Sequence, residues 1–313
     1  MGFSKRLHRR ARRLAAVVAL GAATFALAAC GSGGDPLSNS SASPGGGAKV
    51  IVGSANFTES QVLGELYAQA MQAKGVQVET KPGIGSREVY IKALKDGSIS
   101  VVPEYTGNLL LYVDPQATAT TEPEIMQALP GAIGGELKVL EPSQAQDQDV
   151  YVVTKQTAQQ HGIASLEDLK KISATSVLGG PSELQDRAYG PPGLEKIYGA
   201  KFKQFKPYDA PAVKVKDLND NKIQVATFFT TEAAIRDNGY VMLTDPQSMI
   251  LPQNVIPLVR ADVAGNTAAV EAINAVQKVL TTAELTDLNN KVDSEKQEPH
   301  EVAAAWLKAK GLA

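Results

Sequence analysis

Short apolar runs alternate with amphipathic stretches along most of this chain. Residues 49–54 form a β-branched run typical of a buried strand, and residues 59–74 carry apolar side chains at helical spacing, followed by Gly75 as a helix cap. A strand, a helix and a strand are then expected at 76–80, 86–95 and 99–102. This alternation predicts an α/β fold in which helices cover a parallel sheet.

The pattern repeats in the second half of the chain. Strands are expected at 149–154, 177–179, 202–205, 223–227, 240–243 and 255–259, and helices at 166–171, 192–198 and 267–310. The last strand returns after the second set of elements, which predicts two α/β lobes. Folds of this kind bind ligands in a cleft near the carboxyl ends of strands.

The lobes follow from this return of the chain. We expect the first lobe to comprise residues 49–146 and 252–313, and the second lobe to comprise residues 147–251. Hinges are expected near 143–149 and 246–253. The folded part has about 265 residues, which is long for one core and sufficient for two lobes.

The N-terminus has the pattern of a bacterial lipoprotein signal. Six basic residues precede an apolar stretch from Leu14 to Leu27, and the only cysteine of the chain, Cys30, ends the run Leu27-Ala28-Ala29-Cys30. We expect removal of residues 1–29 as a signal peptide and a lipid anchor on Cys30, with residues 30–48 as a flexible tether. The 14-residue apolar stretch is too short to span a bilayer core of about 30 Å, and an uncleaved anchor is the alternative. The chain is therefore expected at the cell membrane, lipid-anchored on the extracytoplasmic face.

Charge and composition argue against several functions. Without residues 1–29 the chain has 25 Lys and Arg against 33 Asp and Glu, a net charge of −8, which does not suit nucleic acid. His161 and His300 lie in polar surroundings, and neither a metal-ligand cluster nor a nucleophile motif is visible. We therefore expect no enzyme activity, no metal and no cofactor. The acidic pairs at 122/124 and 167/168 fall in first helical turns, where carboxylates favour the helix dipole.

Two segments at strand ends are the best candidates for a binding site. Asn56-Phe57-Thr58-Glu59 follows the first strand, with Thr58 as the expected N-cap of the next helix and with Asn56 and Phe57 directed into the cleft. Pro103-Glu104-Tyr105-Thr106-Gly107 holds the same place after the third strand. Capping and turn formation explain either segment alone. Their shared position at one edge of a parallel sheet favours a common site.

These segments resemble those of the substrate-binding proteins of osmoprotectant ABC transporters, a family that takes up glycine betaine, choline and related quaternary amines. The similarity continues through residues 193–199, 230–232, 288–293 and 306–312. The resemblance implies a type II periplasmic-binding-protein-like fold that closes on a small-molecule ligand. It also implies a monomer that delivers this ligand to an ABC permease with ATPase subunits.

The family usually holds its ligand in an aromatic cage, because a quaternary ammonium has no N–H to donate and is held by cation–π attraction. The resemblance places Tyr105 and Phe229 at two cage positions. The other two fall near Asp149, two residues before Tyr151, and at Gln253, so the cage is incomplete. The further candidate ligand contacts are Asn56, Phe57, Thr58, Ser86, Arg87, Glu88, Thr106 and Thr230.

The leading hypothesis is a solute-binding lipoprotein of an ABC importer for compatible solutes of the glycine betaine, choline, carnitine and proline class. The first alternative keeps the transport role but changes the ligand to a larger ring-bearing or hydroxylated, polyphenol-like compound, because the cage is incomplete. A small shift in the alignment, with Tyr151 or Tyr240 completing the cage, is a second possibility. A sensor lipoprotein and a surface enzyme are less favoured.

Overall fold

The computed structural model describes residues 49–313. The expected signal peptide, tether and lipidation site at Cys30 lie outside the described residues. Residues 49–313 belong to one compact unit, and all of the described hydrophobic core clusters lie within it. Within residues 49–313, no helix combines the length and the apolar composition needed to cross a bilayer.

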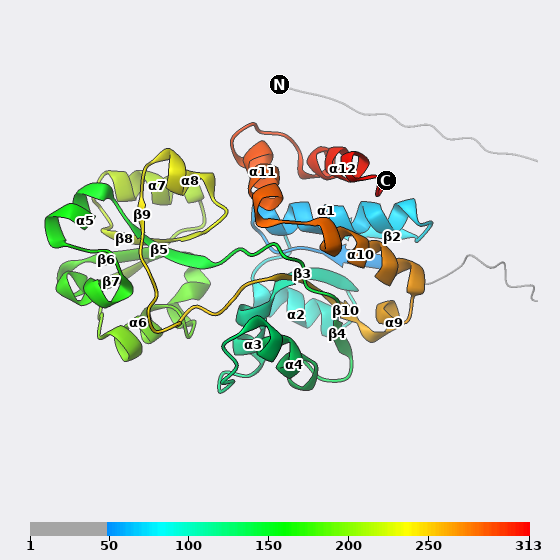
Figure 1. Ribbon diagram of the computed structural model, residues 1–313, viewed down its shortest axis with the longest axis horizontal. Helices are drawn as coiled ribbons and strands as arrows, with labels where there is room; N and C mark the ends of the chain where they lie inside the picture. The colour runs from blue at the N-terminus through cyan, green and yellow to red at the C-terminus, as the bar shows by residue number, and fades with distance from the viewer. Residues whose placement is uncertain (1–48) are drawn as a thin grey trace, which may run out of the picture. The chain divides into compact units, whose positions relative to one another are not determined.

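The first sheet has five strands in the order β2-β1-β3-β10-β4 (Figure 1). Their bounds are Val78–Lys81, Val50–Gly53, Val101–Tyr105, Val255–Arg260 and Leu137–Val139. β1 runs parallel to β2 and β3, as predicted, but β10 runs antiparallel to both β3 and β4. The parallel arrangement predicted for the first three strands is therefore confirmed, and the sheet as a whole is mixed because the returning strand β10 runs in the opposite direction.

Helices cover both faces of this sheet. One core joins the sheet to α1 (Thr58–Ala73) and to the C-terminal helices α10 (Thr267–Val279), α11 (Thr282–Asp293) and α12 (Pro299–Lys310). The other core joins it to α2 (Arg87–Lys95), α3 (Thr106–Val113) and α4 (Glu122–Ala132). A short helix, α9 (Ala261–Ala264), follows β10.

The helical C-terminus predicted at 267–310 consists of these three helices. Leu280 is extended, and Thr281 begins α11 with a capping box to Glu284. Pro299 starts α12 at its first position, where the missing N–H costs nothing. Local capping therefore divides the helical C-terminal segment into three helices.

The second sheet also has five strands, in the order β7-β6-β8-β5-β9 (Figure 1). Their bounds are Gln204–Pro207, Val177–Gly180, Val225–Phe229, Asp149–Val153 and Val241–Met242. β6 is parallel to β7 and β8, whereas β5 is antiparallel to β8 and β9. The associated helices are α5 (Lys155–His161), α6 (Pro191–Tyr198), α7 (Pro211–Asn219) and α8 (Ala233–Asp237).

Local signals for helix ends in this second part were largely confirmed. α6 begins at Pro191, and Gly199 closes it in the left-handed conformation with φ 65°. The helix expected at 166–171 forms, but as a 3₁₀ helix at Leu166–Lys171 that Ser165 and Asp168 cap reciprocally. Glu124 caps α4 in the same way together with Thr121, so the structural interpretation of these acidic residues was correct.

The chain passes from one sheet to the other twice, between β4 and β5 and between β9 and β10. The two passing segments lie side by side, because Gln146 bridges to Asn254 and the Asp147 N–H donates to the Gln253 carbonyl at 3.1 Å. Strands of the first sheet thus come from two separate stretches of sequence. The exact lobe boundaries remain a prediction.

Candidate functional site

Three aromatic rings from three separate segments converge at the strand ends. Phe57 lies directly before α1, Tyr105 ends β3, and Phe229 ends β8 in the second sheet. The centroid of the Phe57 ring lies 6.3 Å from that of Tyr105 and 5.3 Å from that of Phe229. Phe57 is therefore the ring that joins the other two.

The start of α1 differs from the prediction. Phe57 occupies the N-cap position, and no side chain caps this helix end. Thr58 is instead the first helical residue, and its hydroxyl donates to Asp293 at 2.6 Å. Asn56 is exposed beside it. The expected role of Thr58 as the N-cap was wrong, because the chain turns into the helix one residue earlier.

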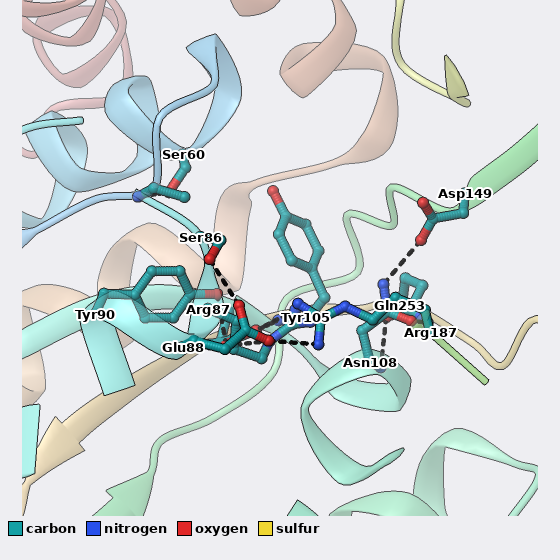
Figure 2. Close-up of polar contacts among 12 residues, drawn as sticks. Ser60, Ser86, Arg87, Glu88, Tyr90, Tyr105, Asn108, Asp149, Arg187 and Gln253 are labelled. Carbon is teal, nitrogen blue, oxygen red and sulfur yellow. Dashed lines mark hydrogen bonds and ion pairs between the residues drawn. The ribbon is translucent and has the colours of Figure 1, made fainter. Parts of the chain in front are cut away.

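An acidic side chain stands beside the rings. Asp149 is the direct cross-strand partner of Phe229, so the two side chains share one face of the second sheet. Asp149 is only 7% exposed, and its Oδ2 accepts a hydrogen bond from Asn108 Nδ2 at 2.8 Å (Figure 2). Burial raises the pKa of Asp149, and the hydrogen bond from Asn108 opposes that rise. The site thus combines ring faces with a buried carboxyl group.

Asn108 is held by the returning segment of the chain. Gln253 is fully buried; its Oε1 accepts from the Asn108 N–H at 3.0 Å, and its Nε2 donates to Asn108 Oδ1 at 2.8 Å. Thr106, also fully buried, donates to the Pro252 carbonyl and accepts from the Asn254 N–H. Both predicted site residues therefore fix the first turn of α3, which aims Asn108 at Asp149.

A buried ion pair is bonded to the Tyr105 backbone. Arg87 donates to both carboxylate oxygens of Glu104, at 2.7 and 3.0 Å, and the Tyr90 hydroxyl donates to the same carboxylate at 2.8 Å. Glu104 also accepts from the Tyr105 N–H at 2.9 Å. Because Arg87 is paired in the bidentate geometry that suits a guanidinium, it acts as a support for the site.

A second ion pair joins α2 to the segment before α6. Arg187 Nη1 lies 2.7 Å from Glu88 Oε1, and the Ser86 hydroxyl donates to the other Glu88 oxygen at 2.6 Å (Figure 2). Partial burial disfavours ionisation of Glu88, but the hydrogen bonds from Arg187, Ser86 and the Glu88 backbone, together with the charge of Arg187, outweigh it and lower the pKa of Glu88 to about 2. Arg187 also lies over the Tyr112 ring, 5.8 Å from its centroid.

The tyrosines considered as substitutes for the missing cage walls lie outside the ring cluster. Tyr151 is 1% exposed, and its hydroxyl donates to the Tyr189 carbonyl at 2.7 Å within the second-sheet core. Tyr240 belongs to the core on the other face and bonds to Asn219. Thr230 is exposed and bonds to Gln148 N–H and Asp147. Phe57, rather than either tyrosine, supplies the third ring.

Asn108 and Arg187 are two polar residues of this region that the sequence did not reveal; they contact Asp149 and Glu88, respectively. Asn108 follows the predicted Tyr105-Thr106-Gly107 segment directly, and its place in the first helical turn was an available signal. Arg187 lies in an irregular segment far from the other candidates, and no local pattern marks it. Within residues 49–313, no cluster of His, Cys, Asp and Glu has the arrangement of a metal site, and His161 and His300 are both exposed.

The two mixed sheets with flanking helices define the class of this protein, the type II periplasmic-binding-protein fold. A solved glycine betaine/carnitine/choline ABC transporter structure matches with a TM-score of 0.66 at 22% identity, over 84% of this chain and 99% of that one. Lactococcal OpuAC in complex with glycine betaine matches with a TM-score of 0.62 at 18% identity, over 84% and 96%. The fold prediction is thereby confirmed.

The chain belongs to the family of substrate-binding domains of ABC-type glycine betaine transport systems, whose model matches residues 48–309. It is 26% identical to the glycine-betaine-binding protein of Pseudomonas aeruginosa, over 82% of this chain and 86% of that protein. It is also 26% identical to the glycine betaine-binding protein YehZ of Escherichia coli, over 84% and 90%. A weaker relative, at 22% identity over 84% of this chain and 48% of that protein, is the ergothioneine permease and binding protein EgtU of Helicobacter pylori. The protein is therefore the extracytoplasmic binding component of an ABC importer and not an enzyme.

Proposed function

We propose that this protein captures a compatible solute of the glycine betaine, choline, carnitine and proline class, in which glycine betaine, choline and carnitine carry a quaternary ammonium group. The observation that carries the proposal is the convergence of Phe57, Tyr105 and Phe229 beside the Asp149 carboxyl. Ring faces attract a cation that has no N–H to donate, and a desolvated contact of this kind contributes about 2 kcal/mol. The negative charge of the carboxylate would attract the cation in place of the missing fourth ring.

The mechanism uses the two sheets as lobes. The contacts that join them include those of Asn108 with Asp149 and of Arg187 with Glu88. A ligand that touches both lobes stabilises the closed state by its higher affinity for that state. The two passing segments act as hinges near 143–149 and 246–253. The closed monomer then docks on the permease, whose ATPase subunits drive release.

We also propose that the protein is anchored to the membrane by a lipid. The run Leu27-Ala28-Ala29-Cys30 supports removal of residues 1–29 and lipid attachment to Cys30. The Gly- and Ser-rich residues 30–48 would tether the domain to the membrane near its permease. Globomycin, which blocks lipoprotein signal cleavage, provides the test. A change in mobility of the wild-type chain, and none in Cys30→Ser, is the expected result.

A larger, ring-bearing ligand is the second candidate. Gln253 falls at the fourth cage position but is buried and bonded to Asn108, so no aromatic ring stands at that position. The relative from Helicobacter pylori is named for ergothioneine, which supports a ligand larger than glycine betaine. Asn108 and Arg187 offer the polar contacts that such a ligand would need.

Calorimetric titration of residues 47–313 separates the two candidates. The panel contains glycine betaine, choline, carnitine and proline, together with ergothioneine and hydroxylated aromatic compounds. Binding of a small quaternary amine supports the leading proposal, and binding of ring-bearing compounds alone supports the second. Absence of binding to every compound in the panel contradicts both.

The ring cluster is tested by truncation. Phe57→Ala and Tyr105→Ala should each weaken binding by roughly tenfold or more, because each removes one cation–π wall. Phe202→Ala is the matched control, since Phe202 is also half-buried but packs on the second-sheet core. Equal affinity in the Phe57 variant and the control would place the ligand elsewhere.

A further inference from the structure

A buried carboxylate next to the rings collects three hydrogen bonds. Glu59, the second residue of α1, is 3% exposed. Its Oε1 accepts from the Tyr105 hydroxyl at 2.6 Å, and its Oε2 accepts from Asn289 Nδ2 at 2.6 Å and from the Thr231 hydroxyl at 2.8 Å. Every donor is a side chain, so this carboxylate does not serve the end of its own helix.

The three donors come from distant parts of the chain. Tyr105 ends β3 of the first sheet, Asn289 lies on α11, and Thr231 follows β8 of the second sheet by two residues. Thr231 also donates its N–H to Asp147 Oδ1 at 3.0 Å, in one of the two segments that pass between the sheets. Glu59 therefore connects both sheets with the adjoining passing segment.

The same connection reaches two of the three rings. Tyr105 is bonded to Glu59 directly, and Phe229 lies only two residues before Thr231. A phenol that is hydrogen-bonded through its hydroxyl cannot move its ring out of place without losing that buried hydrogen bond and leaving a buried polar group unpaired. The position of these two rings thus depends on one carboxylate.

The surroundings explain why this carboxylate is tolerated. The side chains that contact Glu59 and Asp147 are those of Tyr105, Thr230, Thr231 and Asn289, and none of them is basic. Burial raises the pKa of both carboxyl groups, and the charge of Glu59 raises the pKa of Asp147 further. Glu59 accepts its three hydrogen bonds from neutral donors in this acidic surrounding.

We propose that Glu59 is a positioning residue, which holds the Tyr105 ring in the ligand site and ties it through Thr231 to the Phe229 strand of the second sheet. Closure of the two lobes then also brings the Tyr105 and Phe229 rings together. This inference rests on the proposed function, because it assumes that the rings hold the ligand. It assigns no ligand contact to Glu59 itself.

The experiment is a double-mutant cycle in residues 47–313, with glycine betaine as the probe. Tyr105→Phe keeps the ring and removes only its hydroxyl, and Thr231→Val removes the other hydroxyl. Each should raise the dissociation constant roughly tenfold, and the double variant should raise it by clearly less than the product, because both bonds end on one carboxylate. Glu59→Gln keeps the side-chain shape and should abolish this coupling.

Tyr67→Phe is the matched control. Tyr67 is another buried tyrosine, and its hydroxyl donates to Gln277 at 3.0 Å rather than to Glu59. The control should lower stability about as much as Tyr105→Phe while leaving the dissociation constant unchanged. Equal dissociation constants for the two variants, or independent effects of Tyr105→Phe and Thr231→Val, would overturn the proposal.

A second measurement separates this inference from the proposed function. Hydrogen–deuterium exchange of residues 225–235 in the ligand-free protein should become faster in Glu59→Gln and Tyr105→Phe than in Tyr67→Phe. If wild-type protein does not bind glycine betaine but this exchange pattern holds, the link through Glu59 stands and the ligand assignment fails. Unchanged exchange in the Glu59 and Tyr105 variants refutes the link whatever the ligand.

Discussion

At the scale of single residues, the site depends on groups whose chemistry is changed by burial. Asp149 is the clearest case, because it lies beside Phe229 with one hydrogen bond from Asn108 and little access to solvent. Burial favours the neutral form of its carboxyl group and so raises its pKa. Under the proposed function, a cation between the rings favours the ionised form, so we expect binding and ionisation at Asp149 to be linked.

The first prediction follows from the sign of this link. Because the pKa of Asp149 is raised, protonation begins at a higher pH than for an exposed aspartate, and affinity for choline should fall as the pH is lowered through that range. Choline keeps its charge throughout, so the ligand does not titrate. Asp149→Asn should weaken binding roughly 10–100-fold at pH 8 and flatten the pH profile. Titration calorimetry between pH 8 and pH 5 is the measurement, and a wild-type profile retained in the variant would contradict it.

At the scale of elements, close packing of α3 on the returning segment positions the polar half of the site. A Cβ added at Gly107 would lie 2.5 Å from Leu251 Cβ, 2.8 Å from the Pro252 oxygen and 2.9 Å from Gln253 Nε2. The glycine is therefore required by contact rather than by backbone conformation. Its absence of a side chain allows Gln253 to reach Asn108.

The second prediction compares two helical glycines. Gly107→Ala should lower the free energy of unfolding by about 1–3 kcal/mol, because overpacking outweighs the better helix propensity of alanine. Gly131→Ala in α4 is the matched control, since no atom lies within 4 Å of the added Cβ, and it should stabilise by about 0.5–1 kcal/mol. Urea unfolding measures both. If both substitutions stabilise the protein, the residues around Gly107 can move to accommodate a Cβ without lowering the free energy of unfolding.

At the scale of the whole molecule, the contacts between the two sheets differ in their exposure to solvent. Asn108 with Asp149 and Glu59 with Thr231 are buried, whereas the Glu88 side chain is 48% exposed in its pair with Arg187. Salt screens exposed ion pairs strongly and buried contacts much less. The closed state should therefore depend only weakly on ionic strength.

The third prediction concerns salt. Between 0.1 and 1 M sodium chloride, the dissociation constant for glycine betaine should change by less than about fivefold, since an exposed pair contributes at most about 1 kcal/mol. In Glu88→Gln, the dissociation constant at low salt should stay within about fivefold of the wild-type value. This variant should also lose most of the remaining salt dependence. Competition binding at each salt concentration provides the measurement. A much steeper loss of affinity would mean that exposed charges control closure.

Much of the fold was accessible from the sequence because its signals are local. The period of apolar residues gave the strands and α1, and Pro191 with Gly199 bounded α6. Tyr105 and Phe229 were found as ring candidates, and the family was identified correctly. Strand β4 and the breaks within 267–310 were missed, since a three-residue strand carries little pattern and caps compete with periodicity.

The sequence by itself determined the alternation of elements, the two aromatic segments at strand ends and the membership in a transporter family, because each depends on neighbouring residues or on whole-chain similarity. The tertiary structure alone decided that Phe57 joins Tyr105 to Phe229, that Gln253 is a buried support, and that Glu59 binds donors from β3, α11 and the end of β8. These contacts join residues up to 230 positions apart. Only tertiary packing brings such residues together, so no local sequence pattern can predict these contacts.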